Sequence, residues 1–394
     1  MARYLIVANR LPVTVVPAGD DYELKPSAGG LATAMAGLGG DGDMLWIGWP
    51  GDTATLSEEA RQRLDVELLG RGLVSVHLSA ADVQGFYEGF SNGVLWPLFH
   101  YQMERVNMDA WRDWEAYESV NRQFAEAIAA QWREGDRIWV HDYQLMLVPA
   151  MVRARLPHAC IGFFLHIPFP SLEVFRTLPW RREVMGGLLG ADVIGFHTYG
   201  YQRSFASCVL RMMALDVVVD EFHWQDRLVR LGTFPISIDT ADFVARASLP
   251  AAEEAAAKIV ARSPEVKLLL GVDRLDYSKG LPRRFLAIER LLEIDPTLEG
   301  RFRFVQVAVP SRTTVESYAQ FRRQLDELVG RINGRFSTTD WAPIQYLYRS
   351  VSAEELVALY RAADVMVVTP LRDGMNLVAK EYLACRVNDD GVLV

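Results

Sequence analysis

Short apolar runs alternate with helix-like segments along the chain, separated by loops of glycine, proline and polar residues. This alternation is typical of βαβ units, in which helices connect parallel strands. In the first half we expect strands at Tyr4–Ala8, Met44–Gly48, Arg137–His141, Cys160–His166 and Asp192–Phe196, and helices at Val120–Trp132 and Leu145–Arg155. In the second half we expect strands at Lys267–Gly271, Arg303–Val309, Ile344–Leu347 and Val365–Thr369, and helices at Ala251–Ala261, Leu281–Ile294, Val315–Ile332 and Ala353–Ala362.

The pattern predicts an α/β fold with two Rossmann-like, doubly wound parallel-sheet domains. A chain of 394 residues is longer than one hydrophobic core usually serves. We place the joint near Phe234–Phe243 and the domains at residues 1–238 and 239–394, with a cleft between them. The final GVLV is typical of a further buried strand, after which a doubly wound domain should continue with a helix. We therefore expect the second domain to be truncated at its C-terminal end.

Bulk properties narrow the class of partner. The formal net charge of −9 argues against nucleic acid or an anionic membrane as the main partner. No apolar run reaches the roughly 18 residues that span a bilayer, and the N-terminus does not resemble a signal peptide. The three cysteines show no metal or disulfide spacing, which favours a cytoplasmic location.

Several polar residues follow predicted strands of the first half, at the sheet edge where α/β proteins bind ligands. Arg10 follows the first strand, and Gly29 and Gly30 precede a helical run, where backbone N–H groups can approach a phosphate. Asp142 is positioned to bind sugar hydroxyls or take a proton, although it could equally cap the following helix. His166 could contact a ligand, with a structural histidine as the alternative.

The strongest local signal in the second half is GVDRLDYSKG, residues 271–280. Arg274 and Lys279 lie between a strand and a helix, where two cations can stabilise a departing diphosphate. The alternative is an ion pair with Asp276. Arg312 follows another strand, and Asp373 and Glu381 follow the strand VMVV, where they could contact a sugar, a phosphate or a ribose.

Other chemistries lack their signatures. The sequence has neither GxxxxGK[ST] nor a GxGxxG that opens a helix. Asp41-Gly42-Asp43 matches the DxD of metal-dependent glycosyltransferases, but it precedes a strand in a glycine-rich turn. We expect no metal and no cofactor.

As a set, these segments closely resemble the trehalose-6-phosphate synthase family, glycosyltransferase family 20. The matching segments are VANRLPV, SAGGLATAM, WIGWPG, FYEGFSNGVLWPLFHY, WVHDYQLMLVP, GFFLHIPFPS, DRLDYSKGLPRRF, SRTTVESY, GRIN and TPLRDGMNLVAKEY, and they span nearly the whole chain. Within them, Asp273 stands where family members often carry glutamate.

The resemblance implies a metal-independent, retaining glucosyltransferase of the GT-B fold. It would transfer glucose from UDP-glucose, bound mainly by the C-terminal domain, to glucose 6-phosphate, bound mainly by the N-terminal domain. The products would be α,α-trehalose 6-phosphate and UDP. No protein nucleophile stands out, and the resemblance implies a same-face substitution in which the leaving diphosphate would help to deprotonate the incoming hydroxyl.

The resemblance also implies residue roles. Arg10, Tyr87 and Arg312 would hold the acceptor phosphate, with Trp46 or Trp49 lining that site. Asp142 and His166 would act near the reaction centre, on the acceptor and donor sugars respectively, and Arg274 and Lys279 on the diphosphate. The remaining donor contacts would come from Gly29, Gly30, Val351, Asp373, Leu377, Val378, Ala379, Lys380 and Glu381, the last on the ribose.

Two alternatives remain at this stage. A glucosylglycerol-phosphate synthase would keep the fold and use a smaller acceptor. A non-catalytic regulatory subunit of a trehalose synthase complex would keep the fold without turnover, although the full set of polar residues argues against it. The donor base and the oligomeric state, a homo-oligomer included, stay open.

Overall fold

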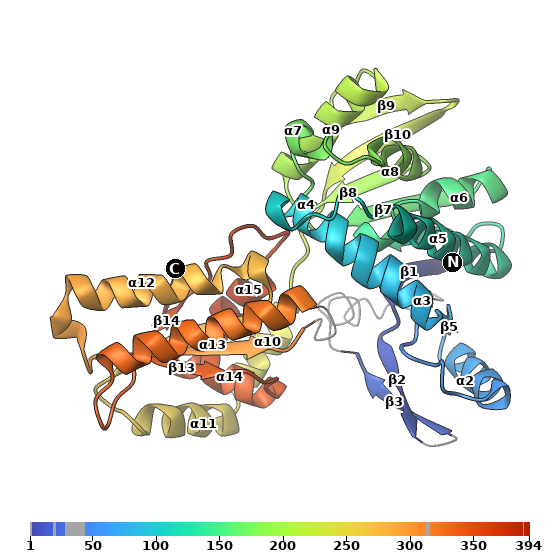
Figure 1. Ribbon diagram of the computed structural model, residues 1–394. Coiled ribbons are helices and arrows are strands. Elements are labelled where there is room, and N and C mark those ends of the chain that lie inside the picture. Colours follow the sequence, from blue (N-terminus) through green and yellow to red (C-terminus); the bar gives the residue numbers. More distant parts are fainter. Residues whose placement is uncertain (1, 19–20, 28–43, 312–315, 389) are drawn as a thin grey trace. The chain divides into compact units, whose positions relative to one another are not determined.

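The computed structural model describes residues 2–18, 21–27, 44–311, 316–388 and 390–394. The chain divides into two compact units, Met1–Ile236 and Ser237–Val394. Each unit is built around a mainly parallel sheet with helices packed on it (Figure 1). No helix within the described ranges combines the length and the apolar character needed to cross a lipid bilayer.

The described part of the N-terminal unit has a sheet with strand order β5-β4-β1-β6-β7-β8-β10-β9. All neighbouring strands in it are parallel except β10 and β9. The strands are β1 (Tyr4–Arg10), β4 (Met44–Trp49), β5 (Leu73–Ser75), β6 (Arg137–His141), β7 (Cys160–Leu165), β8 (Val193–Phe196), β9 (Glu221–Trp224) and β10 (Arg227–Thr233). A separate hairpin pairs β2 (Val13–Ala18) with β3 (Asp21–Pro26).

Helices connect these strands. They are α2 (Glu58–Gly70), α3 (Ala80–Asp82), the π-helix η1 (Val83–Leu95), α4 (Trp96–Phe99), the 3₁₀ turn η2 (Met103–Arg105), α5 (Trp111–Gln131), the 3₁₀ turn η3 (Tyr143–Leu145), α6 (Val148–Arg155), α7 (Leu172–Phe175), α8 (Arg181–Leu188) and α9 (Tyr199–Met213). Beyond their exposed first residues, β6, β7 and β8 carry mostly buried apolar side chains, as expected for parallel strands covered on both faces.

The C-terminal unit has a parallel sheet in the order β13-β12-β11-β14-β15. Its strands are β11 (Lys267–Arg274), β12 (Phe302–Val309), β13 (Ile344–Leu347), β14 (Val365–Met366) and β15 (Val392–Leu393). Its helices are α10 (Thr240–Ala247), α11 (Pro250–Ala261), η4 (Tyr277–Lys279), α12 (Leu281–Ile294), η5 (Pro296–Leu298), α13 (Glu316–Phe336), α14 (Ala353–Ala362) and α15 (Leu377–Cys385). Helices α10, α11, α14 and α15 pack on one another, as do α12 and α13.

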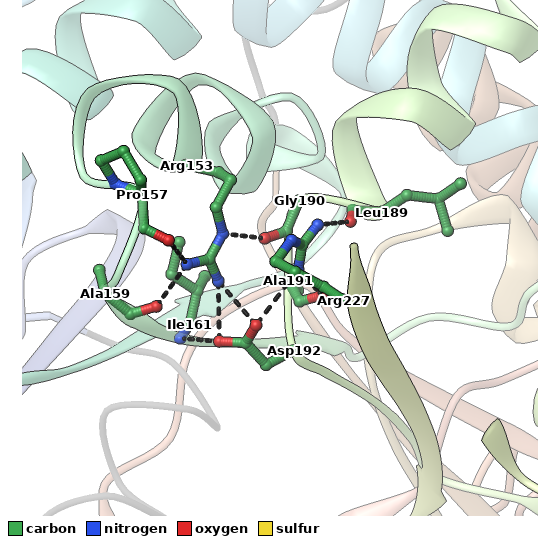
Figure 2. Close-up of polar contacts among 9 residues, drawn as sticks. All are labelled: Arg153, Pro157, Ala159, Ile161, Leu189, Gly190, Ala191, Asp192 and Arg227. Atoms are coloured by element: carbon green, nitrogen blue, oxygen red, sulfur yellow. Dashed lines mark hydrogen bonds and ion pairs between the residues drawn. The ribbon is translucent and has the colours of Figure 1, made fainter. Parts of the chain in front are cut away.

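An ionic clamp joins the amino ends of β7, β8 and β10, opposite the edge at which ligands bind in such sheets (Figure 2). The carboxylate of Asp192 accepts two hydrogen bonds from Arg153, at 2.7 and 2.8 Å, and one from the Ile161 amide at 2.8 Å. Arg227 adds a hydrogen bond of 3.2 Å to the same carboxylate and also binds the Leu189 carbonyl at 2.7 Å. The clamp therefore has a structural role.

The predicted α/β class is confirmed, and the differences lie mostly in element bounds. Helix α5 begins at Trp111 rather than at Val120, and its buried face begins with Tyr117, ahead of the predicted start. The predicted helix Leu145–Arg155 is a 3₁₀ turn followed by α6. The segment GVLV contains strand β15, but the prediction that this strand is buried is wrong, because β15 lies exposed at the edge of the sheet.

Candidate active site

Arg10, Trp49 and Tyr87 gather at the carboxyl ends of β1 and β4. These two parallel strands are paired so that Arg10 lies beside Trp49. The Arg10 guanidinium lies 4.3 Å from the centre of the Trp49 ring and 5.6 Å from that of Tyr87, which η1 supplies. Cation–π contacts hold such a side chain in place without neutralising its charge. The cluster thus presents an oriented cation, as binding of a phosphate requires.

Trp46, the alternative to Trp49, has a different environment. Its side chain packs in the core with Ile6 and Leu64, and its indole N–H donates to the Arg10 carbonyl at 3.1 Å. Trp49 therefore belongs to the Arg10 cluster, whereas Trp46 holds the Arg10 backbone through its hydrogen bond to the Arg10 carbonyl.

Asp142 follows β6 in an unusual backbone conformation. Its φ of +75° lies in the region that non-glycine residues rarely adopt. The Asp142 amide donates to the Phe164 carbonyl at 2.8 Å, and its carboxylate accepts from the His166 amide at 3.1 Å. Its side chain makes no capping hydrogen bond to η3, contrary to the alternative of a helix cap. Backbone strain of this kind is retained where the surroundings enforce it, commonly at functional sites.

Two buried side chains of α5 hold the loop that carries Asp142. The Tyr117 hydroxyl donates to the Tyr143 carbonyl at 2.7 Å. The Asn121 amide donates to the Gln144 carbonyl at 3.0 Å. These contacts connect the loop to the core and account for the burial of a polar residue on the inner face of α5.

His166 lies in a row of three histidines that the sequence analysis did not single out as a group. His141 ends β6, His166 follows β7 and His197 follows β8. Nδ1 of His141 lies 3.0 Å from Nε2 of His166, and the rings of His166 and His197 are 5.3 Å apart. The available signal was a histidine at the end of three successive strands.

Burial keeps the first two of these rings neutral. It lowers the pKa of His141 to about 3. Burial, together with the neighbouring rings of His141 and His197, holds the pKa of His166 well below its ordinary value of 6.5. The pair therefore acts at neutral pH through hydrogen bonds rather than through charge.

In the C-terminal unit, Lys279 pairs with Asp373. Lys279 ends η4, and its ammonium group lies 2.6 Å from Oδ2 of Asp373. Asp276, the partner considered from sequence, is fully buried and accepts hydrogen bonds from the Ser278 amide and the Tyr318 hydroxyl. For Lys279, the alternative of an ion pair with Asp276 is therefore wrong, because its ammonium group binds Asp373 instead. Arg274 ends β11 and is exposed.

A buried polar network supports this loop, and sequence reasoning missed it. Arg284 of α12 pairs with Asp273 and donates to Gln306 at 2.8 Å and to the Thr369 hydroxyl at 3.0 Å. The network connects β11, β12, α12 and the segment after β14. In the chain, Asp273 directly precedes Arg274 and Arg284 follows Lys279, so the network anchors both ends of the loop that carries these two cations. A fully paired set of this kind rigidifies the backbone above it.

The start of α15 lies beside Asp373. Asn376 caps this helix through the Ala379 amide at 3.0 Å and also donates to Asp373 at 3.2 Å. The backbone of Leu377, Val378, Ala379 and Lys380 forms the first turn, and a helix N-terminus favours a negative ligand. Glu381 follows in the second turn.

Glu381 is half-buried rather than simply solvated. Its carboxylate accepts a hydrogen bond of 2.7 Å from the Tyr360 hydroxyl. Burial raises the pKa of Glu381 above its ordinary value of 4.5, and the bond from Tyr360 opposes that rise. Val351, in contrast, packs against the core of the C-terminal unit, after β13.

Some predicted positions lie outside the described residues. They are Gly29, Gly30, Arg312 and the Asp41-Gly42-Asp43 segment. Within the described ranges, the acidic, histidine and cysteine side chains form no group of three that could hold a metal ion. The three cysteines form no disulfide.

Comparison with known proteins identifies the family. The family model of glycosyltransferase family 20 matches residues 2–394. The chain belongs to glycosyltransferase family 20. This agrees with the family resemblance of its motifs and with the strand-end positions of the candidate residues.

Curated family 20 relatives match this chain over its full length. A bifunctional trehalose-6-phosphate synthase/phosphatase of Thermoproteus tenax is 46% identical, and this chain covers 54% of its length. A UDP-forming α,α-trehalose-phosphate synthase of Dictyostelium discoideum is 42% identical, with 53% of its length covered. A UDP-forming enzyme of Aspergillus fumigatus is 43% identical, with 77% covered. The chain thus spans about half the length of the first two relatives.

Solved family 20 structures share the fold. A UDP-forming α,α-trehalose-phosphate synthase of Burkholderia xenovorans in complex with glucose-6-phosphate is 36% identical, with a TM-score of 0.87. A structure from E. coli bound with UDP-2-fluoro glucose is 34% identical, also with a TM-score of 0.87. Each comparison covers 100% of this chain and 84% of the other. The predicted GT-B fold class is confirmed.

Proposed function

We propose that this chain is a retaining, metal-independent glucosyltransferase. It transfers glucose from UDP-glucose to glucose 6-phosphate and releases α,α-trehalose 6-phosphate and UDP. The observation that carries the proposal is the identity of 42–46% to trehalose-phosphate synthases over the full chain. The Arg10 cluster and the Lys279–Asp373 pair, each at the carboxyl edge of a sheet, support it.

The N-terminal unit, taken as residues 1–238, supplies most of the acceptor contacts, and Arg312 of the C-terminal unit adds to them. The oriented guanidinium of Arg10 binds the phosphate of glucose 6-phosphate, together with the Tyr87 side chain and Arg312. Asp142 binds an acceptor hydroxyl near the reacting oxygen, and His166 contacts the transferred glucose. Trp49 positions Arg10 and borders the phosphate.

The C-terminal unit, residues 239–394, supplies most of the donor contacts, and Gly29, Gly30 and His166 of the N-terminal unit add to them. Arg274 and Lys279 bind the diphosphate and stabilise the negative charge that grows on it as the glycosidic bond breaks. Asp373 binds the donor glucose, and Glu381 binds the ribose hydroxyls through its carboxylate. The turn Leu377–Lys380, Val351 and the backbone of Gly29 and Gly30 complete the donor contacts.

Departure of the diphosphate is the main catalytic event. The diphosphate departs from the anomeric carbon of the glucose on the same face on which the acceptor hydroxyl attacks, so a leaving phosphate oxygen can accept the proton of the incoming hydroxyl. This same-face mechanism requires no protein nucleophile. The spacing of the three cysteines favours a cytoplasmic location for this enzyme.

An assay with defined substrates tests the function. The protein is incubated with glucose 6-phosphate and UDP-, ADP- or GDP-glucose in turn, and nucleotide release and the sugar product are measured. We expect release that depends on glucose 6-phosphate, with UDP-glucose the best donor and an α,α linkage by NMR, unchanged by EDTA. Faster turnover with glycerol 3-phosphate as acceptor would identify the glucosylglycerol-phosphate alternative. No acceptor-dependent release with any donor would refute the enzyme.

A further inference from the structure

His141 contacts a proposed substrate-binding residue but has no assigned role of its own. It ends β6, its side chain is buried, and its Nδ1 lies 3.0 Å from Nε2 of His166. The other nitrogen, Nε2 of His141, is buried and has no hydrogen-bond partner among the described residues. This asymmetry determines which nitrogen carries the proton.

A neutral imidazole carries one proton, on either nitrogen. A proton on Nε2 of His141 would be a buried donor without an acceptor, which is rarer in folded proteins than an unsatisfied acceptor. The proton is therefore favoured on Nδ1 of His141, which then donates to Nε2 of His166. Because Nε2 of His166 accepts this bond, His166 must carry its own proton on Nδ1.

We propose that His141 is a positioning residue that holds His166 in its neutral, Nδ1-protonated form, so that His166 offers a hydrogen-bond donor to a sugar hydroxyl. Only the identity of the ligand of His166, a sugar hydroxyl, rests on the proposed function. Low pKa values caused by burial keep both rings neutral, as the arrangement requires.

The geometry around His166 supports this role. Its backbone amide donates to Asp142, so the backbone and the ring are both held from the β6 side. Its Nδ1 makes no hydrogen bond to a described side chain or backbone group. With Nε2 occupied by His141, His166 acts as a donor and not as the base that removes the proton of the incoming hydroxyl.

The neighbouring histidine has a different tautomer and partner. Nδ1 of His197 accepts a hydrogen bond of 3.3 Å from the Ile236 amide, so its proton is on Nε2. The ring centres of His197 and His166 are 5.3 Å apart at a steep angle, 64°. His197 therefore packs against the ring of His166, whereas His141 determines which nitrogen of His166 carries the proton.

The tautomer is measurable without substrate. Long-range ¹H–¹⁵N correlation spectra of the full chain with ¹⁵N-labelled histidine distinguish protonated from unprotonated ring nitrogens, and His166→Gln identifies the His166 signals. We expect His166 to carry its proton on Nδ1 at neutral pH, with a pyridine-like Nε2. A pyrrole-like Nε2 on His166, or a charged ring, would overturn the proposal whether or not the protein transfers glucose.

A matched pair of variants separates positioning from packing. His141→Phe keeps a buried ring but removes the donor, whereas His141→Asn places an amide N–H near the position of Nδ1. We expect His141→Phe to give mixed tautomers of His166 and a kcat reduced about tenfold, the loss of one neutral hydrogen bond, with the KM for glucose 6-phosphate unchanged. His141→Asn should restore the tautomer and most of the turnover.

Two results would contradict the role of His141. One is a His166 tautomer that stays on Nδ1 in His141→Phe. The other is an equal loss of kcat in both variants at equal thermal stability. If the wild-type chain shows no transfer to glucose 6-phosphate, the proposed function fails, yet the spectra still decide whether His141 sets the tautomer.

Discussion

The ammonium group of Lys279 lies 2.6 Å from Oδ2 of Asp373 and joins the loop after β11 to the loop before α15. Both side chains are largely withdrawn from solvent, with exposed fractions of 12% and 19%. The pair brings together a cation proposed to bind the donor diphosphate and a carboxylate proposed to bind the donor glucose. It orients the cation before the ligand arrives, which is how preorganised electrostatic catalysis works.

Replacing Lys279 should impair the chemical step. We expect Lys279→Ala to lower kcat about 100-fold, since a preorganised charge on the leaving group is lost. The matched control is Lys267→Ala. Lys267 pairs with Asp364 at 2.7 Å, but it begins β11 and is 72% exposed. Steady-state kinetics with UDP-glucose should show the control within about twofold of wild type, as for a surface pair. Equal kcat values for the two variants would contradict the role of Lys279.

Donor binding should weaken as the pH falls, through Glu381. Burial raises the pKa of Glu381 above 4.5, and only its charged form accepts two hydrogen bonds from a ribose. The KM for UDP-glucose should therefore rise as the pH falls through the raised pKa, and Glu381→Gln should flatten that profile. Tyr360→Phe removes the hydrogen bond that favours the carboxylate and should shift the profile to higher pH. A wild-type profile that coincides with that of Glu381→Gln would refute this assignment.

The Glu381 carboxyl should also make the unfolding free energy depend on pH. Because the folded-state pKa of Glu381 exceeds the unfolded value, its contribution to the unfolding free energy is largest below pH 4.5. That contribution declines as the pH rises from there to the folded-state pKa and is constant above it. Urea unfolding at a series of pH values should show a flatter dependence in Glu381→Gln than in wild type. Parallel curves for the two proteins would contradict the raised pKa.

Gly280 should not tolerate a side chain. Its φ is +71°, and a Cβ atom would lie 2.6 Å from the Thr369 carbonyl oxygen. We expect Gly280→Ala to reduce the unfolding free energy by roughly 1–3 kcal/mol, and to raise the KM for UDP-glucose because Lys279 is displaced. Gly330 of α13, with nothing within 4 Å of its Cβ position, is the control. Gly330→Ala should stabilise by about 0.5–1 kcal/mol. Urea unfolding measures both changes, and equal effects would disprove the steric argument.

The Asp192 clamp should affect stability without affecting chemistry. Asp192→Ala removes the bonds to Arg153, Arg227 and the Ile161 amide, and it leaves a guanidinium that is only 13% exposed. We expect a loss of about 2–4 kcal/mol in unfolding free energy, with kcat at 25 °C unchanged. Glu221→Ala breaks a solvent-exposed pair with Arg230 and should cost less than about 0.5 kcal/mol. A large change in kcat for Asp192→Ala would place the clamp in the catalytic machinery instead.

Much of the site was predictable because ligand-binding residues of parallel sheets follow strand ends. Arg10, Asp142, His166 and Arg274 each end or follow a strand, as their apolar runs predicted. Trp46 and Trp49 could not be separated in this way, because both lie in one strand. Both are buried, and only the packing of the neighbouring elements shows that Trp46 contacts the core near α2 whereas Trp49 contacts Arg10.

Local patterns also could not reveal partners. Lys279 and Asp373 are 94 residues apart in the chain, and the nearer Asp276 was the partner that sequence suggested. Asp276 is instead fully buried and accepts a hydrogen bond from the Tyr318 hydroxyl. In the same way, Glu381 in a helix gave no hint that Tyr360 and the core would desolvate it.

Local periodicity and recognisable segments were enough to predict the α/β class, the family, most strand ends and the residue types beyond them. The neighbours of each strand end could be learned only from the folded chain, and with them the contacts of His141 with His166 and of Lys279 with Asp373. The physical reason is that hydrogen bonds, ion pairs and desolvation act through space over a few ångströms. The order of strands within a sheet, rather than the order of residues in the chain, determines those distances.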